Sequence, residues 1–71
     1  MNLARKTVRA AVAEIKKVKD LDPEKAHTLE DALYKRVLEA VAADKQPSAE
    51  LSILAKEALE TQKFDFPRMC A

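Results

Sequence analysis

The chain has 71 residues and a formal net charge of +1, and 48% of its residues are hydrophobic although only 4% are aromatic. This length allows one domain with a thin core of Leu, Val, Ile and Ala side chains, which excludes a multidomain protein and leaves little depth for a catalytic pocket. Because the core is thin, the chain is not expected to be an enzyme. Its single cysteine excludes an internal disulfide, so it is not a disulfide-stabilised scaffold.

The first predicted helix spans about residues 3–19. Its apolar residues recur every three or four positions, which places them on one face: Ala4, Val8, Ala11, Val12, Ile15 and Val18. Residues 1–20 carry six basic and two acidic side chains, a local charge of +4, whereas residues 21–71 carry seven basic and ten acidic ones, a local charge of −3. One interpretation is a basic helix packed beside acidic neighbours; the other is a nucleic-acid patch formed by Arg5, Arg9 and Lys16. The charge balance favours the first interpretation.

The second predicted helix spans residues 23–43 and follows a connection in which Leu21 is expected to pack inward. Asp22 has the character of an N-cap and Pro23 that of a first helical residue. The apolar stripe is wide enough to face two neighbours, as in the middle helix of a bundle: Ala26, Leu29, Leu33, Val37, Ala40 and Val41, with Tyr34 and Leu38 beside them. Glu30 falls inside this stripe, and a buried carboxylate needs a partner. We therefore expect Glu30 or Asp31 to bind Arg68 if the C-terminal tail folds back.

The third predicted helix spans about residues 48–62 after Pro47, with Ser48 favoured over Gln46 as its cap. Its inward residues are Leu51, Leu54, Ala55, Ala58 and Leu59, while Ile53 points the other way and is a candidate for a contact outside the monomer. The short connections between neighbouring helices predict an all-α, up-down-up three-helix bundle over residues 1–62.

The remaining residues, 63–71, form a short tail that is expected to be extended, because Phe66 precedes Pro67. Phe64 and Phe66 either pack on the bundle, where each buried ring contributes about 1.5–3 kcal/mol, or project and dock in a groove of another protein. The thin core favours the packed tail. Cys70 is expected to be partly exposed and to have no catalytic role.

Metal and cofactor binding are not predicted. His27, Glu30 and Asp31 emerge from one side of the second helix, but three ligands from a single helix, with no second histidine or cysteine to join them, are a poor metal site. A lone histidine and a lone cysteine likewise predict no nucleophilic catalysis.

Two stretches are similar to a known group of proteins. Residues 27–42, HTLEDALYKRVLEAVA, and residues 58–71, which end in FDFPRMCA, resemble segments of small, uncharacterised bacteriophage and prophage proteins. Met69 stands where that group tends to have an aromatic residue. The resemblance implies a phage origin and the cytoplasm of an infected bacterium. It implies no activity and transfers no functional residue.

These observations predict a small non-enzymatic protein-interaction module, such as a phage accessory protein that binds and modulates a host or phage protein. The candidate partner-binding residues are Phe64, Phe66, Arg68, Tyr34 and Ile53. The alternatives are nucleic-acid binding through the basic face of the first helix and self-association into a larger helical assembly. A protein partner is favoured over nucleic acid. No membrane association is expected, since no apolar run approaches the roughly 20 residues of a membrane span.

Overall fold

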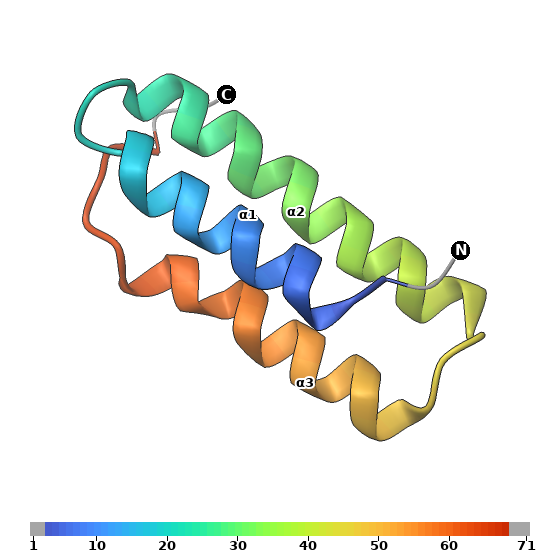
Figure 1. Cartoon of the computed structure of the whole chain (residues 1–71). Helices are drawn as coiled ribbons and strands as arrows, with labels where there is room; N and C mark the ends of the chain where they lie inside the picture. Colours follow the sequence, from blue (N-terminus) through green and yellow to red (C-terminus); the bar gives the residue numbers. More distant parts are fainter. Residues whose placement is uncertain (1–2, 69–71) are drawn as a thin grey trace.

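The computed structural model describes residues 3–68 of the chain. Three α-helices follow one another, α1 (Arg5–Val18), α2 (Pro23–Ala43) and α3 (Ser48–Ala58), and the 3₁₀-helix η1 (Leu59–Lys63) continues α3. Each helix runs antiparallel to the one before it (Figure 1), and every pair of α-helices is in contact. The predicted all-α three-helix bundle is therefore confirmed.

The two ends of α2 have well-defined caps. The Asp22 carboxylate accepts a hydrogen bond from the Lys25 backbone N–H at 3.1 Å, and Pro23 is the first helical residue, as predicted. At the other end Asp44 has a left-handed backbone, with φ 50° and ψ 41°, and its N–H bonds to the carbonyls of Ala40 and Val41. Because the chain has no glycine, an aspartate occupies the position where helices most often place one.

Three helix boundaries differ from the prediction. The helix α1 begins at Arg5 rather than near residue 3, because Ala4 before it is extended. Ser48 is the first residue of α3 and not its cap; Pro47 holds the cap position, and no side chain caps this end. The α-helical part of α3 ends at Ala58, and the tighter turns of η1 replace its expected last turn, as is common at helix ends.

Gln46 ties the start of the chain to the α2–α3 connection. The Leu3 N–H donates to Gln46 Oε1 at 2.7 Å, and Gln46 Nε2 donates to the Leu3 carbonyl at 3.0 Å. The same amide nitrogen donates to Glu50 at 2.7 Å. Since Leu3 and Gln46 are both buried, these bonds satisfy backbone groups that water does not reach.

The core lies along the shared axis of the three helices and receives one ring from the tail. Its buried apolar side chains are those of Leu3, Val8, Ile15, Ala26, Leu33, Val37, Leu51, Leu54, Ala58 and Phe66. Figure 1 shows the tail crossing the end of the bundle where α1 connects to α2. The alternative in which the tail packs on the bundle is the one observed.

Several large apolar side chains lie outside the core. The prediction that Leu21, Leu38, Val41 and Leu59 face inward is wrong: their exposed fractions are 83%, 68%, 47% and 56%. Ile53 is 43% exposed, as its position out of the helical pattern indicated. The outer part of the wide stripe on α2 has no neighbouring helix, because the two other helices cover only adjacent parts of the circumference of α2.

Candidate functional site

Arg68 holds the C-terminal tail against the bundle. Its guanidinium donates to the two carboxylate oxygens of Glu30 at 2.9 and 3.1 Å. It also donates to the backbone carbonyls of Thr61 and Phe64, at 2.8 and 3.2 Å. The guanidinium carbon lies 3.9 Å from the centroid of the Phe66 ring, a cation–π contact. Of the two carboxylates predicted to bind Arg68, Glu30 does so and Asp31 does not.

This ion pair lies at the edge of the core. The side chain of Glu30 is 3% exposed and that of Arg68 is 27% exposed. Burial alone would raise the pKa of Glu30, but the hydrogen bonds from Arg68 and Thr61, together with the positive charge of Arg68, outweigh it and lower that pKa. The hydrogen bond to Glu30 in turn raises the pKa of Arg68, despite some burial. The pair is therefore fully ionised near neutral pH.

Tyr34 connects α2 to the chain that follows α3. Its hydroxyl lies 2.5 Å from the hydroxyl of the buried Thr61, and the side-chain amide of Gln62 donates to it at 2.7 Å. Thr61 is not predictable from the sequence, because a threonine in an amphipathic helix gives no signal that distinguishes a buried hydroxyl from an exposed one. In the described part of the chain, no buried side-chain nitrogen or oxygen is left without a partner.

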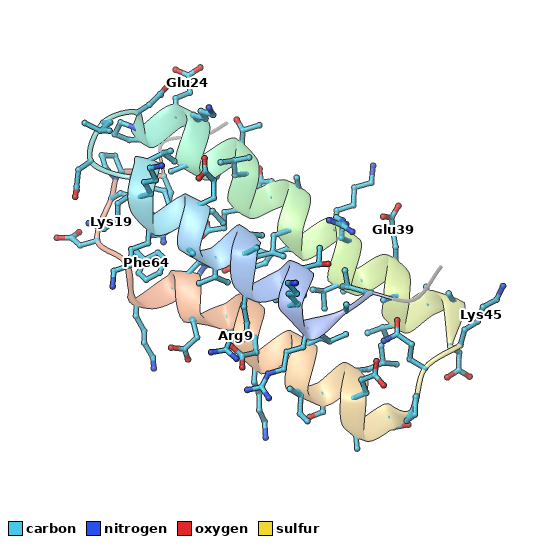
Figure 2. All side chains as sticks on the ribbon, in the orientation of Figure 1. Arg9, Lys19, Glu24, Glu39, Lys45 and Phe64 are labelled. Carbon is cyan, nitrogen blue, oxygen red and sulfur yellow. The ribbon has the colours of Figure 1, made fainter. Side chains whose placement is uncertain are left out.

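The predicted partner-binding residues do not form one exposed surface. Phe66 is buried, Phe64 is partly buried at the same end of the molecule as Lys19 (Figure 2), and Arg68 and Tyr34 are bonded within the chain. Ile53 stands apart from them on α3. Phe64, Phe66 and Arg68 pack or bond where the tail meets the bundle, and Tyr34 bonds to η1 nearby. Met69 and Cys70 lie outside the described residues.

His27, Glu30 and Asp31, which share one side of α2 in the sequence, do not converge on one point. The Asp31 carboxylate lies 3.6 Å from His27 Nδ1, whereas Glu30 binds Arg68. Within residues 3–68, no three side chains of His, Cys, Asp or Glu are arranged to hold a metal ion.

A surface hollow of about 700 Å³ lies at the α1–α2 connection, with Leu21, Pro23 and Pro67 in its wall. The Asp22 carboxylate in this wall caps α2, and the Thr28 hydroxyl donates to the Glu24 carbonyl at 3.1 Å. His27 also lines the hollow, and its Nδ1 lies 3.6 Å from the Asp31 carboxylate.

An apolar face lies on the flank shared by α2 and α3. The Tyr34–Thr61 bond shows that the Tyr34 flank of α2 faces η1, and Leu38 and Val41 follow on that flank at helical spacing. On the neighbouring chain, Ala55 of α3 and Leu59, the first residue of η1, are four residues apart and share one side of the helix. We call Tyr34, Leu38, Val41, Ala55 and Leu59 the α2–α3 face.

The basic residues of the first 20 positions divide into paired and unpaired ones. Arg5 Nε donates to Glu57 on α3 at 2.9 Å, and Lys19 contacts Asp20 at 3.0 Å. The other four form no ion pair with any residue of the described range 3–68: Lys6, Arg9, Lys16 and Lys17. All four are exposed. We call them the α1 stripe.

The fold and these surfaces define a small three-helix bundle whose C-terminal tail is bonded to α2 through Arg68 and Glu30. No protein-family model, curated protein or solved structure matches this chain. The comparisons do not test the resemblance to phage proteins, which stays a prediction. Among the described helices, none has both the length and the apolar character required to cross a membrane.

Proposed function

We propose that this chain is a small non-enzymatic protein-interaction module whose α2–α3 face receives an amphipathic helix of a partner protein. The observation that carries the proposal is the exposure of three large apolar side chains on packed elements, Leu38 and Val41 on α2 and Leu59 at the start of η1, at 68%, 47% and 56%. Single exposed apolar residues are ordinary, but neighbouring ones on adjacent elements mark an interaction site.

The arrangement of the helices favours a helix as the occupant. On one side of the α2–α3 pair, α1 packs against both helices and covers the core. The opposite side presents the same antiparallel pair with apolar side chains along it. A helix seated there would complete a four-helix arrangement, and helix-in-groove docking uses anchors at this spacing.

The tail is not the surface that we propose. Phe66 is buried and Arg68 is bonded to Glu30, so both side chains act within the fold. Of the residues predicted from the sequence, Tyr34 belongs to the α2–α3 face. The resemblance to phage proteins supports an accessory protein that acts on a host or phage protein in the bacterial cytoplasm.

The test compares one variant on this face with a matched variant elsewhere. Tagged wild type, Leu38→Glu and Leu21→Glu are used to capture proteins from a bacterial lysate, after circular dichroism shows equal helicity. Leu21 is also highly exposed but lies in the α1–α2 connection, so it controls for the change in charge and surface. The protein retained by the wild type is then purified and its affinity measured.

We expect Leu38→Glu to weaken that affinity at least tenfold, which is about 1.4 kcal/mol, and Leu21→Glu to leave it unchanged. Equal binding by all three proteins would contradict the assignment of the face. Sedimentation equilibrium of the purified chain covers the remaining case: a dimer that Leu38→Glu dissociates would make the occupant a second copy of this chain and overturn the partner helix.

A further inference from the structure

The bundle does not use the α1 stripe. Its four cations form no ion pair with any described residue, although α1 lies between two helices that carry acidic side chains. All four side chains are exposed, so their charged groups are free to meet a ligand.

Two of these cations, Lys6 and Arg9, destabilise α1. The first turn of α1 contains Arg5 and Lys6 and no acidic residue, so positive charge lies at the positive end of the helix dipole. Arg9 follows Lys6 by three positions and Arg5 by four, the spacings at which like charges on a helix repel. Neither Lys6 nor Arg9 has an acidic residue three or four positions away. A role in folding therefore does not explain them.

We infer that the α1 stripe binds the phosphate backbone of duplex DNA. At a rise of about 1.5 Å per residue, Lys6 and Lys17 are separated by about 17 Å along α1. Duplex DNA carries one charge per about 1.7 Å of its axis, so the stripe spans about ten phosphate charges. Ala10 and Ala13 lie between the cations, are exposed and have short side chains, so a broad polyanion can approach the helix closely.

The composition of α1 selects among the polyanions. Residues 5–18 include no aromatic side chain on which an unpaired base would stack, and no Asn or Gln to read adenine edges. The apolar face of α1, with Val8 and Ile15, is buried in the bundle and so is not free to enter a lipid surface. What remains is contact of the lysine and arginine side chains with duplex phosphates.

The salt dependence of binding gives a quantitative test. Fluorescence anisotropy follows a labelled duplex of about 20 base pairs, titrated with the chain between about 50 and 200 mM NaCl. Four phosphate contacts give a slope of log K against log salt of about −3.6, a loss of affinity of about 150-fold over this range. In the double variant Lys6→Gln/Arg9→Gln two contacts remain, and the loss falls to about 12-fold.

The control removes two charges from elsewhere. Lys35→Gln/Lys45→Gln changes an exposed residue of α2 and one of the α2–α3 connection, and it lowers the net charge by the same amount. We expect this variant to keep the wild-type slope. Equal slopes in the two double variants, or no binding by the wild type at the lowest salt, would overturn the inference. So would binding to phosphatidylglycerol vesicles without binding to the duplex.

This test is independent of the proposed function. Leu38→Glu changes the α2–α3 face and leaves α1 intact, so we expect that variant to keep the wild-type salt slope even if it no longer captures a protein. A slope that changed in Leu38→Glu as much as in Lys6→Gln/Arg9→Gln would contradict the assignment of DNA binding to α1.

Discussion

The buried charge of Glu30 is compensated by a residue far along the chain. Its carboxylate lies within the apolar stripe of α2, where an unpaired charge is strongly unfavourable. Arg68, 38 positions later, supplies two hydrogen bonds and a compensating charge. The same guanidinium covers the Phe66 ring, so one side chain satisfies the carboxylate and fixes the tail.

Replacing Arg68 by alanine should therefore be severe. Removing one partner of a buried ion pair destabilises a protein by about 3 kcal/mol or more. For a domain of this size each kcal/mol lowers the melting temperature by about 4–8 °C, so we expect a decrease of more than about 10 °C at neutral pH. Thermal melting followed by circular dichroism measures it. Arg36→Ala, an exposed change on α2, is the control and should melt close to the wild type.

The pH dependence of stability should change sign in the same variant. In the wild type the folded-state pKa of Glu30 is lowered below its ordinary value of 4.5, so its contribution is complete above about pH 4.5 and is lost as the pH falls through the folded-state pKa. Without Arg68, burial would raise that pKa, and protonation of Glu30 would then favour the folded state. Between about pH 7 and pH 4 we expect Arg68→Ala to gain stability relative to the wild type. Parallel curves would contradict this account.

The sequence predicted this pairing because a carboxylate in an apolar stripe requires a partner, whatever the details of the fold. It did not predict Thr61 or Gln46. The hydroxyl of Thr61 is buried only because η1 packs it against Tyr34. Gln46 is fixed by a bond to Leu3, 43 positions away. Neither residue differs locally from a polar residue on the surface.

At the scale of the helices, the start of α2 follows from local signals, whereas the cap predicted at Ser48 does not form. Pro23 and Asp22 determine the start of α2 through backbone geometry that needs no other part of the chain. The width of an apolar stripe is different, because periodicity does not say which part of it has a neighbour. Leu38 and Val41 were therefore expected in the core, whereas the bundle leaves them exposed.

The end of α2 offers a prediction at this scale. Asp44 adopts a left-handed backbone, which is less unfavourable for aspartate than for most residues but still less comfortable than for glycine. We expect Asp44→Gly to stabilise the chain by up to about 1 kcal/mol and Asp44→Ala to destabilise it, since alanine has neither glycine's freedom nor the short polar side chain of aspartate. Melting temperatures should thus rank glycine above aspartate above alanine. A glycine variant that melts below the wild type would contradict the claim that the left-handed backbone at Asp44 lowers the stability of the chain.

On the scale of the whole molecule, the tail belongs to the fold. Three helices with so few aromatic residues make a thin core, and Phe66 enlarges it at the end where α1 meets α2. A folded chain of this length is stabilised by only about 4–10 kcal/mol in total, so a single ring and a single ion pair form a large fraction of that stability.

Removing the tail should consequently unfold much of the bundle. A chain that ends at Lys63 loses the Phe66 ring, about 1.5–3 kcal/mol, and leaves Glu30 buried without its partner. A chain that ends at Arg68 keeps every contact that the structure assigns to the tail and serves as the matched control. Circular dichroism at 37 °C should show reduced helicity in the shorter chain only. Adding Glu30→Leu to that chain should restore part of the lost helicity, because it removes the unpaired carboxylate but not the need for the ring. Equal melting temperatures of the two truncated chains would contradict this prediction. The helices would then be stable without the contacts of Phe66 and Arg68.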